Sequence, residues 1–425
     1  MDTIKSIKIN LKQKNNLILI TAIAIILKTI QFIIISPQIV PDSNDYLFLS
    51  NHIFDFSSET FGLRTPVYPL FIKGLLANLN LIAAGQHLLG IISVILLYLS
   101  VREISTVKIA MIACLLLILS PIVLYDSVIS TESLSVFFNI LFLFTTIKAL
   151  KSGRTLFTIL SSAALIILIF TRPQYFIYIP AICLYFAIQR PVIRIYLIII
   201  IPFLVSVLWV AAVYRTTGIF NMTTLSGFNL INHTGKYIEK APAEYNFLKS
   251  VYIKQRDEDI RLRGSQSGTI WIVRDTIQKS LNLNKTQLSI LLNKIDIYLI
   301  LNFPLDYLRS VWSSLRLTFI VPDDDFRIIR NSFLFRFLLP FYQILIGIGF
   351  MGGIFTVCYL KKHSCHNIYI LMFYLVIANV IASAIFDYGT NGRFFAPSYP
   401  MLFIWTAILI HDLKVLKPEG SKSPL

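Results

Sequence analysis

The sequence predicts an all-α, polytopic membrane protein with about ten transmembrane helices, interfacial helices in the first outer loop and a mixed outer loop region. Hydrophobic residues make up 56% of the 425 residues and charged residues only 14%, whereas a soluble domain carries roughly 25% charged residues. Mean hydropathy is +0.72. The apolar residues gather in runs close to the ~20 residues that a helix needs to cross a bilayer. The candidate spans are 16–36, 85–101, 107–124, 132–150, 155–171, 174–189, 193–213, 333–359, 367–386 and 397–412.

The basic residues predict the orientation of these helices. The formal net charge is +16, and many Lys and Arg residues flank apolar runs, a pattern that favours membrane orientation over nucleic-acid binding. Basic residues occupy alternate short segments: Lys5–Lys14, Arg102–Lys108, Lys148–Arg154, Arg190–Arg194, Lys361–Lys362 and the tail with Lys414 and Lys417. The positive-inside rule then places both termini in the cytoplasm. We interpret the first apolar run as a retained helix, because it is long for a signal peptide and no A-x-A site follows it.

Three regions follow from this topology. Residues 1–213 form an N-terminal transmembrane module with a first outer loop at 37–84, residues 214–332 form an outer loop region, and residues 333–425 hold the last helices and a cytoplasmic tail. Within the outer segments, 65–77 and 303–321 are apolar but carry prolines and charges, so we expect interfacial helices there.

Polar groups collect at the outward ends of the predicted helices. The acidic candidates are Asp42, Asp45 and Glu132, and the basic candidates are Arg64, Arg172 and Arg393. Ionisable groups at bilayer depth cost roughly 2.5–3.5 kcal/mol each on insertion scales, so they usually face a cavity or one another. Carboxylates can accept protons or bind a divalent cation, and arginines can bind phosphate oxygens with two parallel hydrogen bonds.

Each candidate also has a structural interpretation. Asp42 and Asp45 can cap a short helix, since Asp is a favoured N-cap residue, and Glu132 can cap or solvate the start of its own helix. Arg172 and Arg393 can anchor helix ends at the membrane interface.

The order of these outer motifs resembles the GT-C fold glycosyltransferases that use lipid-linked sugars, above all the bacterial relatives of dolichyl-phosphate-mannose protein mannosyltransferases and aminoarabinose transferases. The matching motifs are Asp42 four residues before Tyr46, then Arg64-x-Pro66-x-Tyr68-Pro69, Ser120-Pro121 with Thr131-Glu132, Thr171-Arg172-Pro173 and Tyr388-Gly389-x-x-x-Arg393-Phe394. The family often has Asp-Glu where this chain has Asp42-Ser43, so Asp45 is the alternative second acid.

The resemblance implies an inverting, hexosyltransferase-type enzyme of the bacterial inner membrane. Its donor would be a sugar on a polyprenyl phosphate, and its acceptor a glycan, a lipid or a protein. Asp42 would be the general base, Glu132 would position the acceptor or a divalent cation, and Arg172 and Arg393 would neutralise the leaving phosphate. Tyr46, Arg64, Tyr68 and Tyr388 would complete the substrate-binding set.

Two other functions remain open from the sequence. A transporter or flippase of lipid-linked sugars would place ionisable groups near mid-span and often shows paired repeats, neither of which is visible here. A polysaccharide polymerase or ligase would use the same donor on another fold, and long outer loops fit it too. The early Asp42 loop and the Arg64–Pro69 segment favour the transferase.

Overall fold

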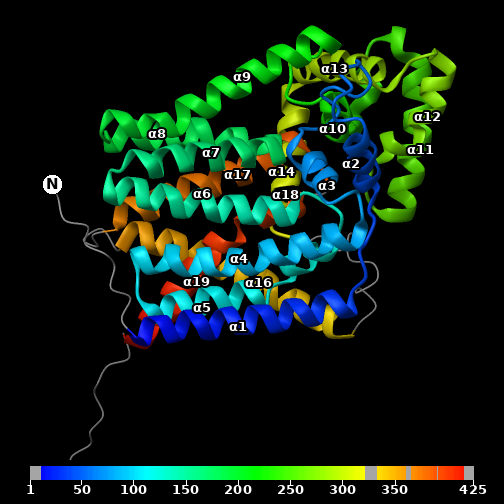
Figure 1. Cartoon of the computed structure of the whole chain (residues 1–425). Coiled ribbons are helices and arrows are strands. Elements are labelled where there is room, and N and C mark those ends of the chain that lie inside the picture. The colour runs from blue at the N-terminus through cyan, green and yellow to red at the C-terminus, as the bar shows by residue number, and fades with distance from the viewer. Residues whose placement is uncertain (1–10, 321–332, 360–364, 390, 416–425) are drawn as a thin grey trace, which may run out of the picture.

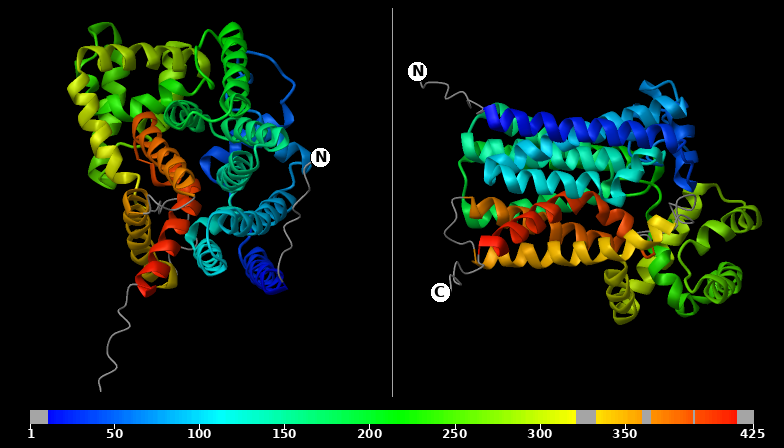
Figure 2. Two further views of the ribbon diagram at one scale, coloured as in Figure 1. Left: turned by 90° about the vertical axis from the view of Figure 1, so that its left-hand side faces the viewer. Right: turned by 90° about the horizontal axis from the view of Figure 1, so that it is seen from below.

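The computed structural model describes residues 11–320, 333–359, 365–389 and 391–415. These residues form helices joined by turns and loops, and their only β pairing is an isolated bridge between Gln38 and Val128. Long helices lie side by side in one bundle, and a group of shorter helices covers one end of it (Figure 1, Figure 2). The all-α prediction is therefore confirmed.

The bundle contains α1 (Leu11–Ile34), α4 (Leu79–Ile104), α5 (Val107–Ile118), α6 (Glu132–Ser152), α7 (Thr155–Thr171), α8 (Tyr178–Gln189), α9 (Leu197–Thr217), α16 (Phe333–Tyr359), α17 (His366–Phe386) and α19 (Tyr399–Val415). Within the described residues, seven helices are long and apolar enough to cross a membrane, or up to nine if each of two bent helix pairs counts as one span. The chain is an integral, multi-pass membrane protein.

Each of the ten predicted spans overlaps one of these helices, but three are interrupted or short. The predicted span 107–124 is broken into α5 and a 3-10 helix, η1 (Pro121–Ser127), which meet at an angle of 54°. Pro121 stands at the break, where its missing N–H and fixed φ stop the α-helical hydrogen-bond ladder. α7 and α8 have only 17 and 12 residues, so the lengths alone give fewer spans than the apolar pattern does.

Local sequence signals explain where several helices begin and end. The Asn78 side chain accepts hydrogen bonds from two backbone N–H groups of the first turn of α4, and the Thr106 side chain accepts one from the first turn of α5. α6 ends at Gly153 and α9 at Gly218, both with positive φ, a conformation that glycine adopts without steric cost. Since α9 continues to Thr217, the predicted boundary at 213 falls inside this helix.

The remaining helices gather at one end of the bundle, which we call the subdomain end. They are α2 (Pro41–Asn51), α3 (Val67–Gly74), α10 (Ser226–Thr234), α11 (Asn246–Arg263), α12 (Thr269–Leu281), α13 (Lys285–Asn302), α14 (Pro304–Leu317) and α18 (Asn391–Phe395). The first residues of α1 and the last of α19 lie at the opposite end (Figure 2). There, Lys148 and Lys151 pair with Glu103 at 2.5 and 3.7 Å.

The outer region predicted to be mixed contains, in its described part, helices α10 to α14 and short 3-10 helices joined by turns. Helices α10 to α13 share a separate hydrophobic core, in which Phe228, Tyr252, Ile270, Leu292 and Ile295 are fully buried. We call residues 219–317 the helical subdomain. A polar sequence with short apolar stretches was enough to build this core, because each helix contributes only one apolar stripe.

Helix α14 presents its polar side to the protein and its apolar side outward. Ser310 and Ser314 are buried, whereas Leu305, Leu308 and Trp312 are 67, 58 and 63% exposed. α14 meets α13 at an angle of 104° and lies across the ends of the bundle helices (Figure 1). This inverted pattern fits the interfacial helix predicted for 303–321.

Candidate functional site

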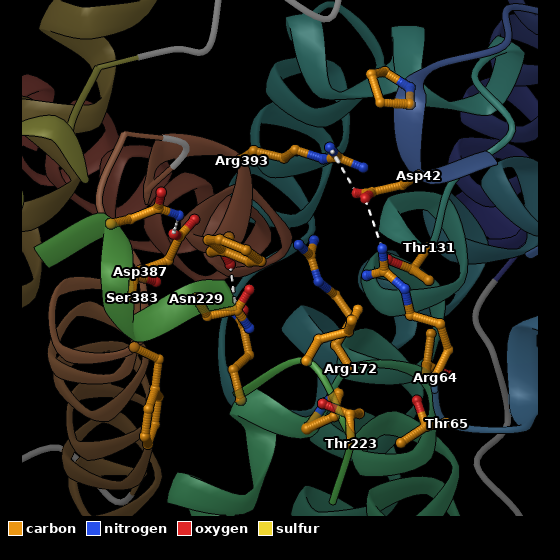
Figure 3. Close-up of a pocket in the computed structure, with 18 of the residues that line it drawn as sticks. Asp42, Arg64, Thr65, Thr131, Arg172, Thr223, Asn229, Ser383, Asp387 and Arg393 are labelled. Carbon is orange, nitrogen blue, oxygen red and sulfur yellow. Dashed lines mark hydrogen bonds and ion pairs between the residues drawn. The ribbon is translucent and has the colours of Figure 1, made fainter. Parts of the chain in front are cut away.

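A cavity of about 960 Å³ lies where the bundle meets the helical subdomain (Figure 3). Its charged lining residues among those described are Asp42, Arg64, Arg172, Asp387 and Arg393. Apolar residues from several bundle helices and their connecting loops line another part of it, among them Ile35, Ile39, Leu124, Phe176, Ile177 and Phe386. The cavity therefore joins a charged centre to an apolar wall at the level of the helix ends.

The start of α2 holds Asp42 at this cavity. Pro41 occupies the first helical turn, where its fixed φ suits the helix. Ser43 then fixes the turn from both sides: its Oγ accepts from the Val40 N–H at 2.9 Å and donates to the Ile129 carbonyl at 2.6 Å. Asp42, between these anchors, points into the cavity (Figure 3).

A short stretch of backbone pairing at Gln38 brings this turn beside Glu132. Gln38 pairs with the 127–129 segment through two backbone hydrogen bonds, from its N–H to Ser127 at 2.7 Å and from Ile129 to its carbonyl at 2.9 Å. Glu132 begins α6 only three residues after Ile129. The first loop and the start of α6 thus carry their acids to the same place, although 90 residues separate them in sequence.

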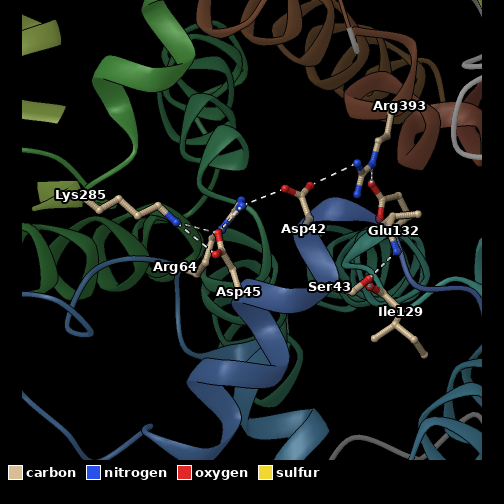
Figure 4. Close-up of polar contacts among 9 residues, drawn as sticks. Asp42, Ser43, Asp45, Arg64, Ile129, Glu132, Lys285 and Arg393 are labelled. Carbon is tan, nitrogen blue, oxygen red and sulfur yellow. Dashed lines mark hydrogen bonds and ion pairs between the residues drawn. The ribbon is translucent and has the colours of Figure 1, made fainter. Parts of the chain in front are cut away.

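Three arginines from distant segments bind these two acids, and Figure 4 shows two of them, Arg64 and Arg393. Arg64 contacts Asp42 at 2.8 Å, and Arg393 contacts the other Asp42 oxygen at 3.2 Å. Glu132, whose side chain is fully buried, pairs with Arg172 at 3.1 Å and with Arg393. Arg393 therefore bridges both carboxylates, and we call Arg64, Arg172 and Arg393 the arginine cluster.

Asp45 belongs to the same ion-pair network but stands one helical turn away from the cavity. It contacts Arg64 at 3.0 Å and Lys285 at 3.1 Å. Among the described residues of this network, Lys285 included, four cationic side chains contact three carboxylates, which is an excess of one positive charge. This balance favours a ligand with one negative charge.

Burial and ion pairing act in opposite directions on Asp42 and Asp45. Burial raises the pKa of both carboxyls, but the neighbouring Arg64, with Arg393 at Asp42 and Lys285 at Asp45, outweighs it and holds each pKa below its ordinary value. Both groups are carboxylates at neutral pH. Burial beside the same cluster raises the pKa of the Tyr46 hydroxyl.

The predicted tyrosines have different positions. Tyr46 lines the cavity, and the Arg64 guanidinium lies over its ring at 5.1 Å. Tyr68 is fully buried behind it, packs edge-on against Tyr46 and donates to Gln86 at 2.8 Å. Tyr388 is not among the described residues that line the cavity, and the Lys236 ammonium lies 3.5 Å from its ring centroid. Of the three, only Tyr46 stands where it can touch a ligand.

The geometry argues against the structural interpretations of these acids and arginines as helix caps and membrane anchors. The N-cap of α2 is Val40 and that of α6 is Thr131, and neither Asp42 nor Glu132 caps a helix. Arg172 and Arg393 are 6 and 8% exposed, so they are not anchors at the membrane surface. Together with Asp45 and Lys285, these residues form one ion-pair network instead.

The sequence did not indicate a place in the site for Lys285, Asn229, Asn232 or Trp271. The latter three line the cavity, and Lys285 reaches Asp45 across 240 residues. Asn284 and Gln287 form a capping box at the start of α13, which marks a helix start but not a functional site. No spacing in the sequence relates these residues to Asp42.

The described carboxylates of the site's ion-pair network are all engaged by cationic side chains. Within the described residues, no group of three or more His, Cys, Asp or Glu side chains has the arrangement of a metal site. Asp42, Asp45 and Glu132 are each bound by two cationic side chains, and a metal ion would have to displace them. The carboxylates that the sequence offered as metal ligands therefore bind arginine and lysine side chains instead.

Comparison with known proteins identifies the fold. No protein-family model matches the chain, and no curated protein matches it by sequence. The oligosaccharyltransferase of Archaeoglobus fulgidus in its apo form matches with a TM-score of 0.52 and 14% identity over 94% of this chain and 51% of that chain. The same enzyme with an inhibitory peptide and a dolichol-phosphate gives a TM-score of 0.52 and 14% identity over 98 and 53%.

A third structure of that enzyme, in complex with zinc and sulfate, matches with a TM-score of 0.50 and 14% identity over 94 and 49%. The chain thus spans about half the length of the structures it matches. The likeness extends over nearly all of this chain, so the bundle and the helical subdomain together share the fold of the matched half of that archaeal oligosaccharyltransferase.

Proposed function

We propose that this protein is an inverting glycosyltransferase that moves a sugar from a polyprenyl-phosphate donor to an acceptor at the outer face of a membrane. The observation that carries the proposal is the arginine cluster beside an acid in a cavity with an apolar wall. Arginine binds phosphate oxygens in forked, charge-assisted hydrogen bonds, and one excess positive charge suits a phosphodiester. The apolar lining around Ile35 and Phe176 suits the first units of a lipid chain.

Asp42 is the acid positioned to act on the acceptor. Its side chain is 34% exposed and faces the cavity, whereas Glu132 is fully enclosed by arginines. In the transfer step the acceptor hydroxyl attacks the anomeric carbon, its proton passes to Asp42, and the bond from that carbon to the phosphate oxygen breaks. The leaving polyprenyl phosphate gains negative charge, which Arg172 and Arg393 stabilise.

The double ion pairing of Asp42 makes it a weak base before the donor binds. A phosphate in the cavity competes for Arg393, since one guanidinium has a limited set of donors. Weaker contact with Arg393 makes the Asp42 carboxylate more basic. We infer that donor binding itself prepares the base, while Glu132 keeps Arg393 oriented.

The assay is sugar transfer by purified protein in lipid nanodiscs. Donors are polyprenyl-phosphate sugars with a labelled sugar, and products are separated by mass from the donor and from free sugar. Formation of a new glycosidic bond, lost in Arg393→Ala, supports the proposal. Movement of intact donor across a liposome membrane without any new bond would support the flippase instead. A lack of both reactions with a broad donor panel would contradict the assignment.

A further inference from the structure

A buried segment of chain links the two acids of the site to the interior of the bundle. It consists of residues 123–133, from the second half of η1 to the first turn of α6, and we call it the acid connector. Every residue from 125 to 133 is at most 5% exposed. Backbone groups that are buried away from water need hydrogen-bond partners, and part of this segment lies between the two helices. The side chains that supply these partners therefore decide where the acids stand.

Gln86 of α4 supplies two of these partners from one fully buried side chain. Its Nε2 donates to the carbonyls of Asp126 at 3.0 Å and Val128 at 2.8 Å. Its Oε1 accepts from the Tyr68 hydroxyl at 2.8 Å. Because a carbonyl oxygen can only accept a hydrogen bond, the amide nitrogen has to face the acid connector, and the Tyr68 hydroxyl holds the amide in that orientation.

An ion pair inside the bundle holds the acid connector as well. The Lys28 ammonium of α1 pairs with one oxygen of the Asp126 carboxylate, and the Ser133 hydroxyl donates to the other oxygen. Helix α4 leaves room for this pair at Gly90, where a Cβ would lie 2.5 Å from the Asp126 Oδ2. Ionisable groups within membrane helices are costly and usually serve a function, so a role beyond packing is expected for this pair.

The acid connector transmits its position to both acids. Its Ile129 carbonyl accepts from the Ser43 hydroxyl at 2.6 Å (Figure 4), and Ser43 directly follows Asp42 in the chain. The other acid, Glu132, lies on the acid connector itself and directly precedes the Ser133 that binds the ion pair. A shift of the acid connector would therefore move the proposed base and its neighbouring acid together.

We propose that Lys28, Gln86 and Asp126 are positioning residues for sugar transfer, an inference that rests on the proposed function. They are not among the described residues that line the cavity, so they act through the acid connector, which holds Asp42 and Glu132 in place. The arginine cluster, which would bind the donor phosphate, comes from other segments of the chain. Displacement of the acid connector should therefore lower kcat more than it raises KM for the donor, since a misplacement of about 1 Å can cost about 10²-fold in rate.

One substitution displaces the ion pair without removing a hydrogen-bonding group or a charge. Gly90→Ala places a methyl group against the Asp126 carboxylate. Gly347→Ala in α16 is the matched control, because an added Cβ there has no packing neighbour within 4 Å among the described residues, and both changes favour a helix to the same extent. We expect kcat to fall at least about tenfold in Gly90→Ala, with KM for the donor within about twofold of the unmodified value. Gly347→Ala should have the kinetics of the unmodified protein.

A second pair of substitutions tests the orientation of Gln86, and it decides the matter if Gly90→Ala does not insert. Tyr68→Phe keeps the ring but removes the hydroxyl that orients the amide. Tyr369→Phe is its control, because the Tyr369 side chain is also buried and its hydroxyl donates to the Ile104 carbonyl at 2.9 Å, at the opposite end of the bundle. Each change removes one buried hydroxyl, so both should lower the thermal unfolding temperature. We expect kcat to fall about three- to tenfold in Tyr68→Phe alone.

Hydrogen–deuterium exchange of the same proteins in nanodiscs follows the acid connector without turnover. Gly90→Ala and Tyr68→Phe should speed exchange in peptides that cover 38–50 and 123–137, and the two controls should not. Faster exchange together with a lower kcat supports the inference. Faster exchange when even the unmodified protein transfers no sugar supports the coupling and contradicts only the proposed function. Unchanged exchange in both test variants overturns the inference. So does a kcat no lower than in the controls, which leaves the glycosyltransferase assignment intact.

Discussion

Replacing Asp42 by Asn tests the proposed general base directly. Asp42 accepts a hydrogen bond from Arg64 at 2.8 Å and forms an ion pair with Arg393 at 3.2 Å. Asn keeps the shape and one accepting oxygen but cannot take a proton. A general base contributes roughly 10²–10⁴-fold, so transfer should fall at least about 100-fold, which corresponds to about 3 kcal/mol in the activation barrier.

The fold should survive this change because each arginine keeps another carboxylate. Arg64 still contacts Asp45, and Arg393 still contacts Glu132. Asp42 is also partly exposed, and ion pairs of this kind contribute at most about 1 kcal/mol. Equal insertion and a thermal unfolding temperature close to that of the unmodified protein are the controls.

The assay compares initial transfer rates from a labelled polyprenyl-phosphate sugar at equal protein amounts. Asp45→Asn is the graded comparison, since Asp45 shares Arg64 but stands outside the cavity, and it should reduce the rate less than Asp42→Asn. Full activity of Asp42→Asn would refute the assignment of the base. Full activity of that variant together with loss of activity in Asp45→Asn would assign the role of general base to Asp45.

Four further predictions follow from the same contacts. Arg172→Ala and Arg393→Ala should raise KM for the donor and lower kcat at least tenfold, with only partial rescue by Lys, because Lys binds as a point charge; unchanged donor kinetics would assign them a structural role. Chelation of divalent cations with EDTA should leave transfer unchanged. Loss of transfer that Mg²⁺ or Mn²⁺ restores would contradict the inference that the carboxylates of the site bind arginine and lysine rather than a metal ion. Lys28 and Asp126 form a buried ion pair, with side chains 4 and 6% exposed. Lys28→Met removes the ammonium and leaves the Asp126 carboxylate buried, so it should lower the free energy of unfolding by about 3–5 kcal/mol, measured by thermal unfolding. The double variant with Asp126→Asn should recover part of this loss. A cysteine at Lys151 should be labelled only from the cytoplasmic side, and labelling from outside would reverse the topology.

The pH dependence provides a separate check on the electrostatics. Because the pKa of Asp42 lies below its ordinary value, the carboxylate stays ionised from pH 8 down to about pH 5. Protonation of the base should therefore cause no loss of kcat/KM in this range. The stability contributed by the Asp42 and Asp45 ion pairs is present above the ordinary carboxyl pKa and is lost as the pH falls through the lowered folded-state pKa. An activity decrease centred near pH 6 that is absent in Asp42→Asn would contradict this order.

The sequence by itself determined that this protein lies in a lipid bilayer and that it is built from helices. Long apolar runs leave few alternatives to membrane helices, because each span must satisfy its own backbone hydrogen bonds. Every predicted span overlaps a helix, and local signals such as Pro121 and Gly153 mark helix ends. The order of outer motifs also selected Asp42, Arg172 and Arg393, since chemistry that requires charge at a membrane surface restricts the residue types.

Only the tertiary structure decided which of these residues meet and with what partners. The β-bridge at Gln38 and the hydrogen bond from Ser43 to Ile129 join two loops. Neither contact leaves a periodic pattern in the sequence. Arg393 bridges Asp42 and Glu132 across more than 250 residues, and Tyr388, although it belongs to the same motif, turns towards Lys236 instead. Ion pairs depend on distances of a few ångströms between side chains, and sequence spacing cannot provide those distances across separate helices.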